Sequence, residues 1–318
     1  MKKIKNKNYF EVIRPGINST FQDLGRNNLH HIGIPSSGAM DNRNYLLSNA
    51  IAGNKENTPV IEFAYQGPHL IFNGEKIFFN ITGDVNFKIT KKNKVIEGNC
   101  YQNYNLENGD QLDIISTNKS VYGYLAISGN FDLKLQWNSC SVNTKANIGS
   151  NYGKRLDKRQ TIKIINTHSN NKKGLKYINS KIEKIRVIKG TNYSYFSEDG
   201  KKNFFNKEFK VTKFTDRMGM RLEGQKIENI VNTNIKSEGL IKGVVQIPTD
   251  GNPIIMLSDH GTIGGYPKIG VIISADYDKL VQLQPGSKIK FNEIELSEAE
   301  TLFKLYNMET QNLISKIT

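Results

Sequence analysis

The sequence predicts a mainly β protein built from barrels or sandwiches, with a few short helices. Apolar and polar residues alternate in many short segments, as in Val121 to Ile127 and Lys288 to Phe291, a pattern typical of half-buried strands. Two hairpins are also indicated, one over residues 85–96 and one over residues 244–257 with Asp250-Gly251 at its turn. Regular alternation of strands with helices is missing, which disfavours a parallel sheet.

Three segments predict helices. Each begins at a residue that caps helix N-termini well and ends at a glycine or at the end of the pattern. Asp41 precedes a pattern that closes at Gly53, Ser274 precedes Ala275 to Gln284, and Ser297 with Glu300 forms a capping box before the C-terminal tail.

A stretch of Ser, Asn, Lys and Gly without periodicity, Thr167 to Lys181, is interpreted as a linker. The expected domains are therefore residues 1–175 and 176–318, and 318 residues suffice for two ordinary domains.

Composition limits the classes of function. The net charge of +14 comes from 44 Lys and Arg against 30 Asp and Glu, yet the lysines form small scattered clusters without interleaved aromatics, so no nucleic-acid partner is expected. No export signal and no long apolar run is visible, so we expect no membrane partner and a cytoplasmic location. Cys100 and Cys140 lack the spacing of metal ligands, and the histidines show none either, so no metal site is expected.

The segment Gly261 to Gly270 has four glycines and one proline in ten residues, which specifies backbone geometry more than side-chain packing. Glycine permits positive φ and close backbone approach, so Gly264 and Gly265 could direct their amides at an anion or small ligand. A tight barrel corner is the alternative.

Several ordered motifs accompany this glycine segment. They are Ser19 to Arg26, Gly33 to Asp41, Asp216 to Gly224, Ser237-Glu238-Gly239, Gln246 to Pro253 and Ser258-Asp259-His260. With these motifs the chain resembles the biotin-dependent carboxyltransferase family from about Val12 to Phe291. It departs from the family pattern at Ser128 to Phe131 and over residues 138–159, where Gly153 to Arg159 replaces the usual glycine-containing turn.

The resemblance implies two cyclophilin-like β-barrel domains and a component of an ATP-dependent 5-oxoprolinase that converts 5-oxo-L-proline to L-glutamate. Partners resembling the A and B subunits of 5-oxoprolinase would be needed, with ATP and Mg²⁺ shared among them. No biotin attachment motif is present in this chain. The alternatives are a carboxyltransferase component acting on urea or a related small amide, with biotin on another chain, and a non-catalytic antagonist of a kinase inhibitor.

Candidate site residues follow from the motifs and from side-chain chemistry. Arg217 and Arg221 flank Gly219 on one face of a predicted strand and would make a fork for a carboxylate or phosphate; pairing with Asp216 or Glu223 is the alternative. Asp23, Asp41 and His260 are the acid/base candidates, although Asp41 is equally a helix cap and a histidine at a strand end is often structural. The remaining substrate-binding candidates are Arg26, Ser37, Gln246, Thr262, Gly264, Gly265 and Tyr266.

Overall fold

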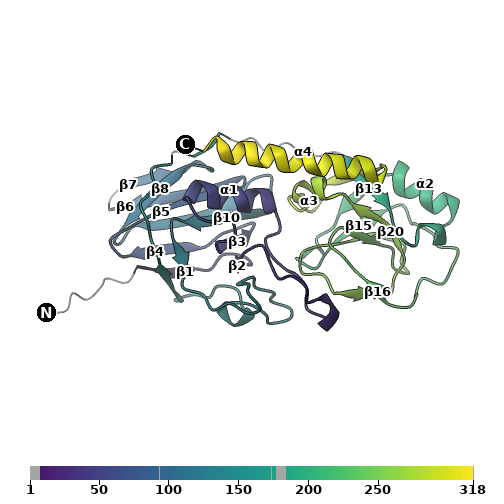
Figure 1. Ribbon diagram of the computed structural model, residues 1–318, viewed down its shortest axis with the longest axis horizontal. Coiled ribbons are helices and arrows are strands. Elements are labelled where there is room, and N and C mark those ends of the chain that lie inside the picture. Colours follow the sequence, from purple (N-terminus) through teal and green to yellow (C-terminus); the bar gives the residue numbers. More distant parts are fainter. Residues whose placement is uncertain (1–7, 93, 173, 177–183, 318) are drawn as a thin grey trace. The chain divides into compact units, whose positions relative to one another are not determined.

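The computed structural model describes residues 8–92, 94–172, 174–176 and 184–317. The chain forms two compact units (Figure 1). Unit 1 comprises residues 1–25, 42–179 and 310–318, and unit 2 comprises residues 26–41 and 180–309. The expected boundary after residue 175 lies close to the division at residues 179 and 180. The units are not contiguous as we expected, because segment 26–41 belongs to unit 2 and segment 310–318 belongs to unit 1. Part of the expected linker, residues 173 and 177–181, lies outside the described residues.

Unit 1 contains two antiparallel sheets. The seven-stranded sheet has the order β11 (Asn130–Phe131), β12 (Thr161–Ile165), β1 (Tyr9–Arg14), β4 (His69–Asn73), β9 (Gln111–Thr117), β6 (Val85–Lys91) and β7 (Lys94–Glu97). The five-stranded sheet has the order β2 (Thr20–Gln22), β3 (Val60–Ala64), β10 (Tyr122–Ile127), β5 (Lys76–Thr82) and β8 (Asn103–Glu107). The predicted hairpin over residues 85–96 is confirmed as the β6–β7 pair.

The two sheets of unit 1 share one apolar core. Alternating strands such as β6 bury every second residue, as the period of two requires. Phe10 of β1 meets Phe72 of β4 with ring centroids 5.6 Å apart, edge to face, and both belong to the same buried cluster as Phe21 of β2 and Phe79 of β5. The core therefore joins both sheets.

Helix α1 (Asn42–Ala52) packs on β5 and β10 of the five-stranded sheet (Figure 1). Its start after Asp41 and its end at Gly53, where φ is +72°, match the sequence prediction. Polar contacts fix it on the sheet: Asn80 donates to the Ser48 carbonyl at 2.9 Å and Thr82 to the Asn44 carbonyl at 2.8 Å. This explains why β10 is buried along its whole length.

Unit 2 is a closed seven-stranded barrel. Its strands, in barrel order, are β13 (Lys184–Lys189), β20 (Lys268–Ile272), β17 (Val244–Gln246), β18 (Ile254–Met256), β15 (Gly219–Gly224), β14 (Phe209–Val211) and β21 (Lys288–Glu293). The parallel β13–β21 pair closes the ring. The predicted hairpin with the Asp-Gly turn is confirmed as β17 and β18. A separate two-stranded sheet pairs β16 (Glu238–Gly239) with β19 (Ile263–Gly264).

Three helices accompany the barrel. Helix α2 (Glu198–Asn206) is capped by Ser197, whose Oγ accepts from the Gly200 amide at 2.9 Å. Helix α3 (Ser274–Leu280) differs from the prediction: its N-cap is Ile273, and it ends four residues early because the chain turns at Val281 to Gln284. Helix α4 (Leu296–Ser315) confirms the helical tail, but its 20 residues exceed the short helices we expected. Its first part packs on Ile273 and Ala275 of unit 2, and Leu313 and Ile314 pack on the unit 1 cluster around α1.

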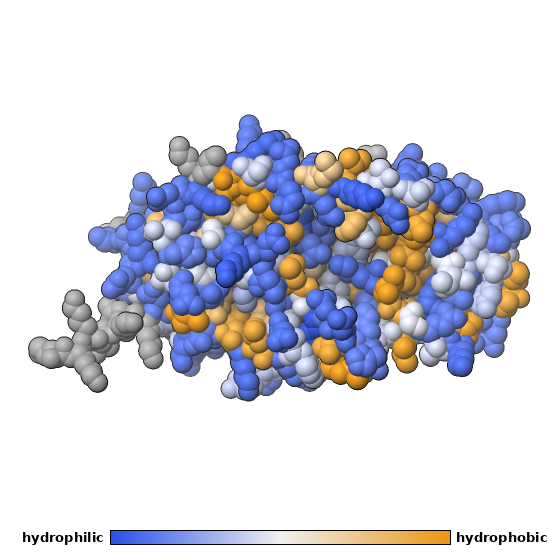
Figure 2. All heavy atoms as spheres, in the orientation of Figure 1, coloured by the Kyte–Doolittle hydropathy of each residue, from blue (hydrophilic) through white to orange (hydrophobic). Residues whose placement is uncertain are grey.

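Short 3₁₀ turns occur at His30–Ile32, Asn151–Gly153 and Tyr193–Tyr195. Polar side chains cover most of the face seen in Figure 2, with apolar residues in smaller groups. Among the described residues, no helix has the length and apolarity needed to cross a membrane. No disulfide joins Cys100 and Cys140, and burial raises the pKa of the Cys100 thiol to about 11.

Candidate active site

A buried ion pair organises one end of the unit 2 barrel. Arg217 precedes β15 and Asp259 follows β18, and the antiparallel register of these strands brings the two together. The guanidinium donates to both carboxylate oxygens, from Nε at 2.9 Å and from Nη2 at 3.1 Å. Both side chains are at most 5% exposed. A two-point charge-assisted contact of this kind fixes orientation as well as position.

The same guanidinium holds a strained loop. Arg217 Nη2 donates to the Gly38 carbonyl at 2.6 Å. The preceding residue, Ser37, is buried and has φ of 55°, in the left-handed region that non-glycine residues rarely adopt. Strain of this sort persists where the surroundings impose it, and it gathers at functional sites. Beyond this loop, Asp41 accepts from Gln282 Nε2 at 2.8 Å.

Lys242 lies beside this ion pair. Its ammonium is 4.4 Å from the centroid of the Tyr277 ring, on α3. Although Lys242 is exposed as a residue, desolvation of its ammonium lowers the pKa of Lys242. Attraction to Asp278 opposes this shift, and a weaker repulsion from Arg217 adds to it. A lysine whose pKa is lowered releases its proton more readily than an ordinary lysine.

Tyr277 remains a neutral phenol. Burial raises the pKa of its hydroxyl, which lies 3.4 Å from Ser258 Oγ. A protonated, buried hydroxyl is a fixed hydrogen-bond partner rather than a charge, and Tyr306 plays a similar role nearby by donating to Asp278 at 2.7 Å.

His260 follows Asp259 and is buried. Its Nδ1 is 2.6 Å from the Gly261 carbonyl, and because a carbonyl only accepts, Nδ1 carries the proton and Nε2 of the neutral ring is basic. Burial lowers the pKa of His260, helped by repulsion from His30, whose ring centroid is 6.0 Å away. At neutral pH the imidazole is therefore poised to accept a proton.

The glycine segment forms part of the small β16–β19 sheet. Neither Gly264 nor Gly265 has a positive φ, so the expected use of left-handed glycines is wrong here. Close packing favours glycine at position 264 instead, since a Cβ would lie 2.7 Å from Leu240 Cδ1 and 2.8 Å from Gln246 Nε2, and the ends of both side chains would have to shift. Gln246 Nε2 also donates to the Tyr266 carbonyl at 3.1 Å, and the Thr262 carbonyl accepts from the Leu240 amide at 2.9 Å.

Comparison with known proteins identifies the family. The profile of the carboxyltransferase domain, subdomain A and B, matches residues 32–293. The chain belongs to this family. It is 34% identical to the 5-oxoprolinase C subunit of Haemophilus influenzae over 89% of this chain and 91% of that protein. With the 5-oxoprolinase C subunit of Escherichia coli it is 30% identical, over 91% of this chain and 92% of that protein.

A solved structure agrees on the fold. The urea amidolyase of K. lactis aligns with 97% of this chain and 20% of its own length, with a TM-score of 0.88 and 24% identity. The curated urea amidolyase of Lachancea kluyveri is 29% identical over 92% of this chain, which spans 17% of that much longer protein.

Within this carboxyltransferase domain, the structure places the predicted site residues in several groups. Arg217, His260, Ser37 and the Gly38 loop lie together in unit 2. Arg26 is buried in the same unit, where its amide donates to the Ser36 carbonyl at 2.8 Å. Gln246, Thr262, Gly264, Gly265 and Tyr266 belong to the glycine segment and its neighbours.

The predicted arginine fork is not formed. Arg217 is committed to Asp259 and Gly38, whereas Arg221 on β15 is exposed and lines a separate cavity of about 500 Å³ with Phe214 and Met218. Pairing with an acidic residue, the alternative we kept open, describes Arg217, although its partner is Asp259 rather than Asp216 or Glu223.

Asp23 lies in unit 1 as a buried acceptor. Its carboxylate receives hydrogen bonds from Ser139 Oγ at 2.7 Å, Ser141 Oγ at 2.5 Å and the backbone amides of Cys140 and Gly25 at 2.7 and 2.8 Å. Four donors saturate the carboxylate, so the described contacts give it the task of holding the segment 139–141 in place.

Sequence reasoning missed two members of the cluster, Lys242 and Tyr277. Nothing local distinguishes Lys242 among 44 basic residues. Asp259 was visible within the Ser258-Asp259-His260 motif, and its position directly beside a candidate histidine was the available signal.

Proposed function

We propose that this chain is the C subunit of an ATP-dependent 5-oxoprolinase, which opens 5-oxo-L-proline to L-glutamate together with partner subunits. The observation that carries this proposal is the similarity to the Haemophilus influenzae protein of that name, 34% identical over 89% of this chain and 91% of the relative. Coverage of nearly the whole of both chains supports a shared role for the complete subunit.

The chemistry of the unit 2 cluster suits the opening of a lactam. Hydrolysis of an unstrained amide needs activation of its oxygen, stabilisation of the negative charge that develops there and proton transfer. Lys242 would supply a positive charge at the developing oxyanion, and His260 Nε2 would accept the proton of an attacking water. When the C–N bond breaks, the same imidazole would return that proton to the leaving nitrogen.

In this proposal Arg217 is a positioning residue. Its contacts to Asp259 and Gly38 hold the loop that carries His260. ATP and Mg²⁺ would be shared with the partners, which we expect to resemble the A and B subunits of 5-oxoprolinase, and the reaction would take place in the cytoplasm.

Reconstitution tests the proposal. The chain, co-purified with the subunits encoded next to it, should form glutamate from 5-oxoproline only when ATP and magnesium are present, and avidin should have no effect. The chain alone should not turn over 5-oxoproline. A complete mixture in which ATP is consumed without 5-oxoproline disappearing contradicts the proposal.

Carboxyl transfer is the second candidate, favoured by the similarity to urea amidolyase over 92% of this chain. It predicts bicarbonate-dependent, avidin-sensitive turnover of urea or a related amide with a biotin-bearing partner. If no amide is consumed in any mixture, the regulatory alternative, an antagonist of a kinase inhibitor, is favoured instead.

A further inference from the structure

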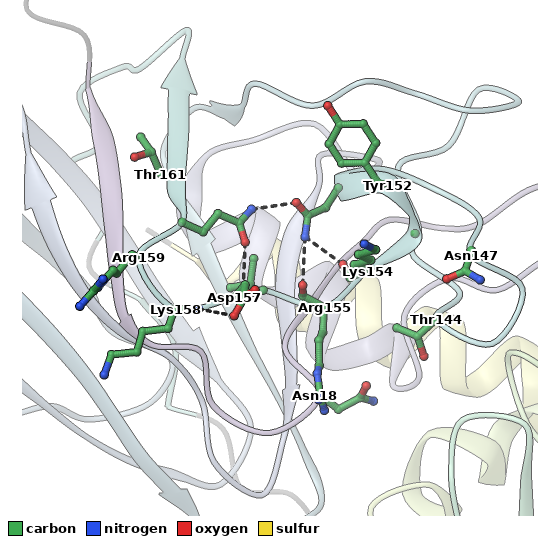
Figure 3. A pocket seen from close by; sticks show the side chains of 14 residues that line it. Asn18, Thr144, Asn147, Tyr152, Lys154, Arg155, Asp157, Lys158, Arg159 and Thr161 are labelled. Atoms are coloured by element: carbon green, nitrogen blue, oxygen red, sulfur yellow. Dashed lines mark hydrogen bonds between the residues drawn. The ribbon is translucent and has the colours of Figure 1, made fainter.

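The loop over residues 144–161 of unit 1 lines a cavity of about 840 Å³ (Figure 3). Four cationic side chains line it, namely Lys154, Arg155, Lys158 and Arg159, against one carboxylate, Asp157. All of these side chains are exposed. The volume is in the range of pockets that take small ligands, roughly 300–1,000 Å³.

The four cations have no ion-pair partner among the described residues. Every recorded ion pair lies elsewhere, and Asp157 instead accepts from the Lys158 backbone amide at 2.7 Å. Four unpaired like charges around one cavity make the electrostatic potential there positive, and this potential attracts an anion.

The loop is held in one conformation before any ligand binds. Asn151 Nδ2 donates to the carbonyls of Lys154 and Arg155 at 2.9 and 3.1 Å, and Gln160 Nε2 donates to Asn151 Oδ1 at 2.8 Å (Figure 3). A preformed set of donors binds without the entropic cost of ordering a loop.

Backbone strain marks the same loop. Asn151, Tyr152 and Arg159 have φ of 52°, 57° and 65°, in the region where glycine is favoured over any side chain. Arg159 therefore carries its charge at a position that glycine would occupy with less strain, and strain of this kind gathers at functional sites.

We propose that this cavity binds the phosphate chain of a polyphosphate, with Arg155, Lys158 and Arg159 as the principal donors. In Figure 3, Lys158 and Arg159 extend to the left of the view and Tyr152 lies apart from them at the top, and Tyr152 is 90% exposed. The arrangement suits an elongated ligand with phosphates at one end and a ring for Tyr152 to stack on at the other. The preference for ATP over inorganic triphosphate rests on the proposed function; the recognition of phosphate does not.

The test is calorimetric titration of the purified full chain, without partner subunits, using ATP, sodium triphosphate and adenosine as separate probes at low salt. ATP and triphosphate should bind and adenosine should not. Arg155→Gln and Arg159→Gly should each weaken binding about tenfold, the effect of about 1.4 kcal/mol. Lys145→Gln, the matched loss of one charge in the same loop outside the cavity lining, should leave affinity unchanged.

Arg159→Gly separates a ligand role from a structural one, because glycine relieves the strained φ. Its unfolding midpoint should stay at or above that of the parent chain while its affinity falls. Tyr152→Leu should reduce the affinity for ATP to that for triphosphate; equal affinities in the parent chain would overturn the nucleotide and leave inorganic polyphosphate as the ligand.

Two results overturn the phosphate site itself: no binding of ATP or triphosphate at millimolar concentration, or an equal loss of affinity in Lys145→Gln and Arg155→Gln. Binding is measured without turnover, so a failure of glutamate formation in the reconstituted mixture leaves this result standing, and the reverse also holds.

Discussion

The buried pair of Arg217 and Asp259 gives the sharpest prediction for unit 2. Asp259→Asn keeps the shape of the side chain but removes its charge, leaving a guanidinium that is 5% exposed without its carboxylate. Breaking a buried ion pair by removing one partner costs about 3–5 kcal/mol. The amide retains one acceptor oxygen for one of the two donors, at 2.9 and 3.1 Å in the parent, so we expect the lower end, about 3 kcal/mol.

Hydrogen exchange of β15 and β18 provides the assay, since these strands pair directly beside the ion pair. A loss of about 3 kcal/mol raises the equilibrium constant for opening of these strands, and so their rate of hydrogen exchange, more than 100-fold over the parent. Glu97→Gln is the matched control, because it breaks an exposed pair with Lys88 at 3.7 Å, where a cost of about 0–1 kcal/mol is the rule.

A double variant checks the physical reasoning. Arg217→Met with Asp259→Leu removes both charges and should be less destabilised than Asp259→Asn, because no buried charge is left without its partner. If Asp259→Asn costs no more than Glu97→Gln, the pair is not a buried electrostatic unit and the account of the loop given above is refuted.

Three further predictions concern other parts of the chain. His260→Gln should lower the turnover of the reconstituted complex about 100-fold or more. Burial lowers the pKa of His260 in the folded parent chain, so the stability of the parent should be highest above the ordinary histidine pKa of about 6.5. It should fall as the pH drops toward the pKa of His260 in the folded state, and the variant should not show this loss. Lys242→Met should abolish turnover yet leave the chain as stable in urea at neutral pH as the parent, or more stable, because the surroundings of Lys242 disfavour its ammonium. This destabilisation of the parent is fully present below the lowered pKa of Lys242 and is relieved as the pH rises toward the ordinary lysine pKa. A marked loss of stability in the variant counts against a functional role. Gly153→Ala should destabilise unit 1 by about 1–3 kcal/mol more than Gly109→Ala. Both glycines have positive φ, but a Cβ at Gly153 would lie 2.2 Å from the Asn147 carbonyl carbon, whereas a Cβ at Gly109 would meet nothing within 4 Å. Equal urea midpoints of the two variants would show that the close approach at Gly153 is unimportant.

The strands and hairpins could be predicted because their signal is local. Alternation of apolar and polar residues over five to seven positions predicts which side chains face the core, and an Asp-Gly pair predicts where the chain reverses. The end of α3 was predicted less well, because the helix ends at Leu280, before Pro285-Gly286. The discontinuous units could not be predicted either, since segment 26–41 belongs to unit 2 through contacts such as that of Gly38 with Arg217.

The candidate site was predicted in part for the same reason. Ser258-Asp259-His260 is a contiguous motif, so it could be found in the sequence, but Lys242 and Tyr277 are 35 positions apart and meet only because β17 and β20 are neighbours in the barrel. Arg217 was predicted as a ligand donor, and its partners in the structure, Asp259 and Gly38, were not predicted. A permanently charged guanidinium is an obvious candidate for a ligand donor, but the structure shows that Nε and Nη2 of Arg217 contact Asp259 and the Gly38 carbonyl.

The roles of the unit 2 side chains differ because some are held by hydrogen bonds within the protein and others are not. A side chain whose hydrogen bonds go to its own protein can fix a loop, but it has few donors or acceptors available to bind a substrate. Arg217 and Asp259 are of this kind. Lys242 and His260 are not: the pKa of Lys242 is lowered and its ammonium lies on the face of the Tyr277 ring, and Nε2 of His260 stays basic because Nδ1 is bound to the Gly261 carbonyl. In the proposed function the chemistry falls to Lys242 and His260. Variants of Arg217 should therefore impair turnover only to the extent that they displace the loop that carries His260.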